Sequence, residues 1–210
     1  MNENLAQLFA MLLSDGSLYF DKSKRTYCIQ FTNTVEGMLD YFRHITNCEF
    51  GKRNFSYNRC GSAKSARFFS VPIAKKLLSE ASTFRTAPFA DGTHPKCKIP
   101  NSILLSKSFT CAFLRAYCSC DGSISIDRSH PRGVIDIACY NPHLRSQLSN
   151  CFESLGIRVS HSTHGLRVYD KRSLSIFSTK VRFLDESRIS DSRSKNLGVR
   201  KNALLDSCFP

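Results

Sequence analysis

The sequence predicts an α/β fold of the α+β type, in which one helix–hairpin–helix–hairpin–helix unit occurs twice. Two observations lead to this prediction. An apolar helical segment ending in Asp-Gly-Ser occurs twice, with its aspartates at Asp15 and Asp121, an offset of 106 residues. In each copy the next residues alternate polar with apolar, as a strand with one buried face requires. We therefore expect two pseudo-symmetric αββαββα repeats with two antiparallel sheets.

The first helix of each repeat carries a small residue at every fourth position. Residues at this spacing share one face of a helix. A face without bulk lets two helices approach until their backbones nearly touch, so we expect these two helices to pack on each other at a central seam. The matched small residues are Ala6, Ala10 and Ser14 in the first copy and Ala112, Ala116 and Cys120 in the second.

The other elements follow in the same order in both halves. The first half predicts strands at 17–21 and 27–33, a helix at 35–46, a hairpin of 51–59 with 65–71, and a helix at 72–82. The second predicts strands at 123–127 and 134–140, a helix at 142–155, a hairpin of 157–163 with 166–169, and a helix at 174–184.

A stretch rich in Pro and Gly separates the repeats and marks a linker. We expect an N-terminal repeat over 1–85, a linker over 86–100 and a C-terminal repeat over 101–184. The remaining 185–210 form a basic C-terminal tail, whose structure the sequence leaves open.

Composition indicates the class of partner. The 210 residues include 30 Lys and Arg against 17 Asp and Glu, a net charge of +13, and 41% are hydrophobic. That much apolar material excludes disorder, and a charge this basic indicates nucleic acid, with an anionic membrane surface as the weaker candidate. The longest mainly apolar run, 8–13, is far shorter than the roughly 20 residues of a membrane span. With no basic region before an apolar stretch at the N-terminus, we expect an intracellular protein.

The ten cysteines show no two-residue spacing of the kind found in zinc knuckles and redox motifs. The closest pair is Cys118-Ser119-Cys120. We expect most of the cysteines to serve as small buried apolar residues.

The segments ending Ser14-Asp15-Gly16 and Cys120-Asp121-Gly122 resemble the paired signature helices of the LAGLIDADG homing endonucleases, in the single-chain, two-repeat form. The resemblance covers roughly residues 5–184. It implies a saddle of two antiparallel sheets that straddles duplex DNA above the seam. The implied activity is that of a monomeric, intron-encoded endonuclease. Such an enzyme hydrolyses both strands of a long asymmetric site with divalent metal and leaves short 3′ overhangs.

The family's catalytic acids carry over to Asp15 and Asp121. Its metal ligands carry over to these carboxylates and to the backbone carbonyls of Ser14 and Cys120. The resemblance implies a cofactor of about two or three divalent ions, Mg²⁺ in the active enzyme, with Mn²⁺ or Ca²⁺ as substitutes in binding. Hard cations prefer oxygen ligands, and bound metal relieves the repulsion between two close carboxylates. Taken singly, an Asp-Gly pair after a helix is also a common turn signal, so either acid alone could be structural.

One feature departs from the family pattern. The family often places a Lys or Gln near the end of the second strand of each repeat, where it organises water around the scissile phosphates. This sequence has Asn33-Thr34 and Tyr140-Asn141 in those places. The basic residues that could substitute are Lys22, Lys24, Lys107 and Arg128.

We expect the first hairpin of each repeat to lie in a major groove, where alternate side chains meet base edges. The other side chains of these alternating strands, Leu18, Phe20, Ile29 and Phe31 in the first repeat, should face the helices. The residues at the hairpin tips should contact phosphates. Because the exposed sets differ, the target should be asymmetric. The expected DNA-binding residues are Ser17, Tyr19, Lys22, Lys24, Arg25, Cys28, Gln30, Thr32, Asn33, Arg53, Arg59, Arg67, Ser123, Ser125, Asp127, Arg128, Arg132, Asp136, Ala138, Tyr140, Arg158 and Arg167.

Two other functions fit the same fold and charge. One is an RNA-binding maturase that helps its own intron to splice, an activity that some members of this family have. The other is a non-cleaving DNA-binding regulator, which would tolerate the loss of one acid. The presence of both acids favours the endonuclease.

Overall fold

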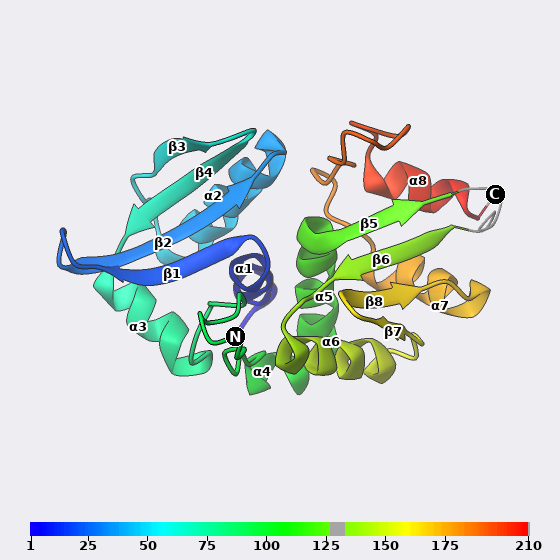
Figure 1. Ribbon diagram of the computed structural model, residues 1–210, viewed down its shortest axis with the longest axis horizontal. Coiled ribbons are helices and arrows are strands. Elements are labelled where there is room, and N and C mark those ends of the chain that lie inside the picture. The colour runs from blue at the N-terminus through cyan, green and yellow to red at the C-terminus, as the bar shows by residue number, and fades with distance from the viewer. Residues whose placement is uncertain (127–132, 210) are drawn as a thin grey trace.

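Two similar units lie side by side in the computed structural model, which describes residues 1–126 and 133–209 (Figure 1). The first unit contains α1 (Glu3–Leu13), β1 (Gly16–Asp21), β2 (Thr26–Asn33), α2 (Glu36–Phe50), β3 (Ser56–Cys60), β4 (Ala63–Phe69) and α3 (Val71–Glu80). Its four strands form one antiparallel sheet in the order β1-β2-β4-β3.

The second unit repeats this order. After the short helix α4 (Asn101–Leu104), it contains α5 (Lys107–Asp121), β5 (Gly122–Ser125), β6 (Val134–Ala138), α6 (Pro142–Ser154), β7 (Ser160–Ser162), β8 (Gly165–Val168), α7 (Lys171–Ile176) and the π-helix η1 (Phe177–Val181). The sheet order is β5-β6-β8-β7, which matches the first sheet strand for strand. The predicted pair of αββαββα units is therefore confirmed.

Local chemistry explains why the helices begin where they do. Side chains of Asn2, Ser70, Ser106 and Asp170 each accept a hydrogen bond from the backbone N–H three residues on. Asn141 does the same at α6, where it accepts from the next two free N–H groups and is followed by proline at the first helical position. These are the preferred caps of helix N-termini, because they satisfy donors that have no partner inside the helix.

The seam between the units is formed by α1 and α5, which pack along each other between the two sheets (Figure 1). Ala6, Ala10 and Ala116 are completely buried, and Ala112 is 2% exposed. At the N-terminal ends of the two helices, the Ser108 hydroxyl donates to the Glu3 carboxylate at 2.5 Å. The prediction that small residues bring these helices together is confirmed.

The helices α1 and α5 are each followed by a glycine that no other residue could replace without movement of the backbone. A Cβ atom on Gly16 would lie 2.5 Å from the Cα atom of Leu12, and one on Gly122 would lie 2.4 Å from the carbonyl oxygen of Cys118. The chain leaves the helix so close to the preceding turn that only a hydrogen atom fits there. This steric requirement accounts for the glycine in both Asp-Gly pairs.

Several predicted boundaries differ from the structure. Helix α2 runs to Phe50 instead of ending at residue 46, and the following hairpin starts at Ser56 instead of Gly51. Gly51 has a φ of 74° and ends α2, so the glycine is a helix terminator and not the first residue of a strand. The last helix of the second unit starts at Lys171, three residues early, because Asp170 caps it.

The C-terminal segment, whose structure the sequence left open, packs against the second unit. It ends in α8 (Lys201–Ser207), which lies against β5, and it buries Ile189 and Leu205 in the core. Arg188 and Arg200 form an isolated antiparallel bridge between its two ends. No helix in residues 1–126 and 133–209 is long and apolar enough to cross a membrane.

Candidate acidic site at the helix seam

Asp15 and Asp121 stand at the same end of the seam. Asp121 is the last residue of α5, and Asp15 follows α1 by two residues. Because the two helices pack side by side, both carboxyl groups arrive where the helices meet the first strands of the two sheets. The negative charge of Asp15 is close enough to raise the pKa of Asp121.

The pKa values of both acids are raised. Burial raises the pKa of Asp15, while a hydrogen bond from Asn33 and the positive charge of Lys201 oppose this shift. Burial and the charge of Asp15 raise the pKa of Asp121 to about 7, against a hydrogen bond from Tyr117 and the charge of Lys201. Two acids that hinder each other's ionisation form a site that favours a bound cation.

Different side chains support the two acids. The Asn33 amide, at the end of β2, donates to the Asp15 carboxylate at 2.8 Å, and the backbone carbonyl of Asp15 accepts from the N–H of Thr32 at 3.0 Å. At the equivalent place in the second unit stands Cys139. The hydroxyl of Tyr117, one helical turn before Asp121, donates to the carbonyl of Ala138 at 3.4 Å and opposes the rise in the pKa of Asp121. The pseudo-symmetry of the fold therefore does not extend to the groups that hold the acids.

Lys201, in the first turn of α8, is the functional candidate that sequence reasoning missed. Its side chain is buried, and Nζ donates to the backbone carbonyls of Ser119 at 2.7 Å and of Gly122 at 2.5 Å. Nothing in the sequence distinguishes it from the other basic residues of the C-terminal segment, because only the packing of α8 brings it to the seam.

Three thiols surround Asp121, and all of them stay protonated. Burial raises the pKa of Cys139 to about 11 and raises the pKa of Cys118 and of Cys120 well above the usual value of a thiol. A neutral thiol is a poor metal ligand, since the thiolate is the form that binds. Oxygen atoms are therefore the donors that this site offers.

Within the described residues, no group of three or more His, Cys, Asp and Glu side chains could hold a metal ion. The candidate donors at the seam are the carboxylates of Asp15 and Asp121, and the sequence resemblance predicts that the backbone carbonyls of Ser14 and Cys120 join them. The Ser14 hydroxyl is itself occupied, because it donates to the carbonyls of Ala10 and Met11. Few carboxylates and several open positions suit Mg²⁺, which keeps some of its water ligands.

Asp121 is accessible from two sides. A cavity of about 270 Å³ lies between Asp121, Tyr117 and the linker residues Thr86, Ala87 and Pro88. A second cavity, of about 220 Å³, extends from Asp121 across the second sheet. It is lined by Ser123, Asp136, Ile137, Ala138, Tyr140, Ser162, His164, Gly165 and Leu166. The acid thus connects the seam with the exposed face of the sheet.

Most of the side chains predicted to face DNA lie at least partly exposed on the two sheets. In the second unit Ser123, Ser125, Ala138 and Tyr140 are exposed, and Asp136 is half-buried. In the first unit Tyr19 is exposed, while the cross-strand row of Ser17, Gln30 and Arg67, together with Thr32, is half-buried. The turn residues Lys22, Lys24 and Arg25 are exposed, and Lys24 lies over the ring of Phe69.

Two residues of the first hairpin contradict the predicted alternation of exposed and buried side chains. Cys28 is completely buried, because it lies between Tyr19 and Phe69 in the sheet and both neighbours are aromatic. Phe20, expected to face the helices, is 50% exposed and packs edge-on against Tyr27 near the tip of the hairpin. Asp127, Arg128 and Arg132 lie outside the described residues.

The arginines of the second hairpins are placed unequally. Arg59, on β3, is exposed, whereas Arg53 precedes the strand and donates to the carbonyls of Phe50 and Gly51 at the end of α2. Arg158 precedes β7, and its side chain is exposed. Arg167, on β8, pairs with Asp136 at 2.6 Å.

Lys107 cannot substitute for the missing basic residue at the acids. It is the first residue of α5, and Asp121 is the last, so about 20 Å of helix separates them. Asn141, the other polar residue considered at the second strand, is buried. Its amide donates to the linker carbonyls of Thr86 and Pro95.

Comparison with known proteins supports the same fold. Residues 108–190 match the family model described as a LAGLIDADG-like domain. The structure of I-DmoI in complex with DNA and Mn aligns at a TM-score of 0.60 and 16% identity, over 85% of this chain and 96% of that one. The complex of I-DmoI with DNA and Ca gives the same TM-score and identity over 88% of that chain.

A different protein also shares the architecture. Full-length DUF199/WhiA from Thermatoga maritima aligns at a TM-score of 0.58 and 10% identity, over 87% of this chain and 56% of that one. No sequence among the curated proteins matches the chain. At these identities the structural likeness establishes the fold.

Proposed function

Because residues 108–190 form a LAGLIDADG-like domain on a two-unit fold shared with the homing endonuclease I-DmoI, we propose that this protein is a site-specific DNA endonuclease. It hydrolyses both strands of a long asymmetric duplex target with divalent metal and leaves short 3′ overhangs. The observation that carries the proposal is the pair of buried acids at one end of the seam.

Asp15 and Asp121 are the proposed catalytic residues, and they hold the metal together with the backbone carbonyls of Ser14 and Cys120. Bound Mg²⁺ supplies an activated water and the counter-charge for the phosphorane-like transition state. The hydrogen bond from the Asn33 amide orients the Asp15 carboxylate. Protonated thiols nearby leave the oxygen donors without competition.

The two sheet faces supply the proposed DNA-binding surface. In the first unit it comprises the row of Ser17, Gln30 and Arg67 with the basic hairpin tip, and in the second it comprises the groove that leads from Asp121 along Ser123 to Tyr140. Residues at matched positions differ between the units, so the two half-sites are read by different side chains. An asymmetric target of about two helical turns follows.

Cleavage of selected duplexes tests the proposal. Wild-type protein is incubated with Mg²⁺ and a library of randomised duplexes about two helical turns long, and the cut products are sequenced. Asp15→Asn and Asp121→Asn should abolish double-strand cutting of the selected target and retain binding in EDTA, since each removes one charge and no phosphate contact. If the two sites act independently, each variant should nick one strand. Asp40→Asn, an exposed acid on α2, is the matched control and should cut normally.

Full double-strand cleavage by both variants would contradict the assignment of the acids. Enrichment of one duplex sequence by binding, without any cleavage in Mg²⁺ or Mn²⁺, would instead support a non-cleaving regulator. Splicing of a host intron without DNA cleavage would support the maturase.

A further inference from the structure

We propose that Lys201 is a positioning residue for Asp121, and that the C-terminal segment thereby completes one half of the active site. This inference rests on the proposed nuclease function. Lys201 lies 80 residues beyond Asp121 in the sequence, yet it contacts the backbone on both sides of that acid.

The contacts of Lys201 enclose the Cys120–Asp121 pair. Its ammonium group donates to the Ser119 carbonyl, before the pair, and to the Gly122 carbonyl, after it. Carbonyls in the last turn of a helix lack partners within the helix, and a cation there also suits the helix dipole. One side chain, 4% exposed, therefore fixes the peptide groups that set the direction of the Asp121 carboxylate.

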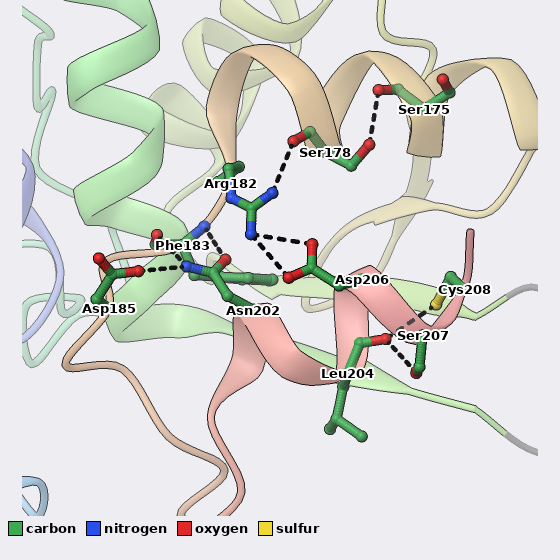
Figure 2. Close-up of polar contacts among 10 residues, drawn as sticks. All are labelled: Ser175, Ser178, Arg182, Phe183, Asp185, Asn202, Leu204, Asp206, Ser207 and Cys208. Carbon is green, nitrogen blue, oxygen red and sulfur yellow. Dashed lines mark hydrogen bonds and ion pairs between the residues drawn. The ribbon is translucent and has the colours of Figure 1, made fainter. Parts of the chain in front are cut away.

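Hydrogen bonds and an ion pair hold α8 against the second unit and so restrict the position of Lys201. Next to Lys201, Asn202 accepts from the N–H of Phe183 at 3.0 Å and donates to its carbonyl at 2.9 Å, and Arg182 pairs with Asp206 at 2.9 Å (Figure 2). Figure 2 shows these contacts tying α8 to the residues that follow η1.

A second donor from the same segment converges on the same carbonyl. The Ser187 hydroxyl donates to the Ser119 carbonyl at 2.9 Å, and the Ser187 carbonyl accepts from the N–H of Lys201 at 3.1 Å. The Ser119 hydroxyl in turn accepts from the N–H of Leu184 at 2.7 Å. The end of α5 is thus held by a connected set of bonds from residues 184–201.

Asp15 is supported in another way. Its hydrogen-bond partners come from β2, namely the Asn33 side chain and the N–H of Thr32. The charge of Lys201 acts on both acids, but its hydrogen bonds fix only the backbone around Asp121. Loss of Lys201 should therefore disturb the Asp121 half of the site more than the Asp15 half. A general loss of stability would not distinguish the two DNA strands, so strand bias is the diagnostic readout.

The test compares Lys201→Met with Lys195→Met, which removes the same charge from an exposed position in the same segment. Cleavage is followed on a target labelled differently on its two strands. Lys201→Met should cut one strand about tenfold more slowly than the other, so that nicked duplex accumulates. Its affinity for the duplex in EDTA should equal that of Lys195→Met, which should cut both strands like the wild type.

Metal binding gives a readout that does not depend on cleavage. Titration of Mn²⁺ into the protein–duplex complex, followed by electron paramagnetic resonance, should show weaker binding in Lys201→Met than in Lys195→Met. Removal of a positive charge alone would tighten Mn²⁺ binding, so tighter binding would overturn the positioning role. Equal slowing of both strands, or cleavage at the wild-type rate, would also overturn it.

Ser187→Ala covers the case in which Lys201→Met does not fold. It removes a donor to the same Ser119 carbonyl and leaves the buried charge in place. It should produce the same strand bias to a smaller degree, and unbiased cleavage would count against the proposal. If the proposed function itself fails, the wild type cuts no duplex, and the Mn²⁺ titration still decides the role of Lys201.

Discussion

The Asn33 amide donates to the Asp15 carboxylate across 2.8 Å, from the end of one strand to the residue that precedes its hairpin partner. A donor fixed in this way favours the ionised acid and opposes the effect of burial. Asp121 has the Tyr117 hydroxyl instead, and its pKa still reaches about 7. The two acids are therefore expected to respond differently to pH and to mutation.

Asn33→Ala should raise the pKa of Asp15 further, because burial then acts without an opposing hydrogen bond. The proton must leave before metal can bind, so the lower limb of the pH profile of cleavage should move to higher pH. The measurement is the rate of duplex cleavage between about pH 5 and pH 9 at fixed Mg²⁺, a range that spans the pKa of about 7 given for Asp121. Asn150→Ala, at an exposed position on α6, should leave the profile unchanged. An unshifted profile in Asn33→Ala would show that its hydrogen bond does not tune the site.

Ionisation of Asp121 should destabilise the metal-free protein at high pH. Its pKa in the folded chain is about 7 against an ordinary value of 3.8, so the folded state binds the proton more tightly than the unfolded state. The free energy of unfolding then falls as pH rises between these values, by at most about 4 kcal/mol.

Asp121→Asn removes this dependence and should raise the melting temperature in EDTA at pH 8 more than at pH 5. Thermal melts of wild type and variant at the two pH values measure the difference, with Asp40→Asn as the exposed control. A gain in melting temperature that is equal at both pH values would contradict the raised pKa.

Ala10→Leu and Ala116→Leu should overpack the seam, because both positions are completely buried where α1 meets α5. The expected loss is about 1–3 kcal/mol in the free energy of unfolding. Urea denaturation measures it, and Ala203→Leu, exposed on α8, is the control. Unchanged urea midpoints in both seam variants would show that α1 and α5 can separate enough to accommodate a leucine side chain.

Duplex binding should weaken steeply with salt. If the hairpins and their tips neutralise about 6–10 phosphates, affinity should fall roughly 10³- to 10⁵-fold between about 50 and 200 mM salt. Fluorescence anisotropy with a labelled duplex in EDTA measures the slope. A nearly flat response would mean that the net charge of +13 is not directed at a phosphate backbone.

The repeat made the architecture predictable. Matched small residues on two helices and matched alternation after each Asp-Gly identify the seam and both sheets, because these patterns are local and occur twice. The position of the two acids follows from the same register. Burial of Cys28 was not predictable in this way, since it depends on two aromatic neighbours from other strands, Tyr19 of β1 and Phe69 of β4.

The groups that support the acids were only partly visible in the sequence. Asn33 was found in the right neighbourhood, but its bond to Asp15 depends on how β2 ends beside α1. Lys201 could not be found, because its role depends on a tertiary contact over 79 residues and on a segment without a repeated pattern. Irregular segments carry no periodic signal from which such a contact can be inferred.

The division of the cysteines into buried and exposed members has a practical consequence for spectroscopy. Of the ten cysteines, Cys48 and Cys60 are exposed, and Cys111, Cys120 and Cys208 are half-buried. Burial keeps the thiols around Asp121 neutral. Maleimide reagents attack accessible thiolates, so a fluorophore would attach first to the two exposed positions. With Cys48→Ser, a single dye at Cys60, at the turn between β3 and β4, would report the arrival of a nucleic acid at that hairpin in real time.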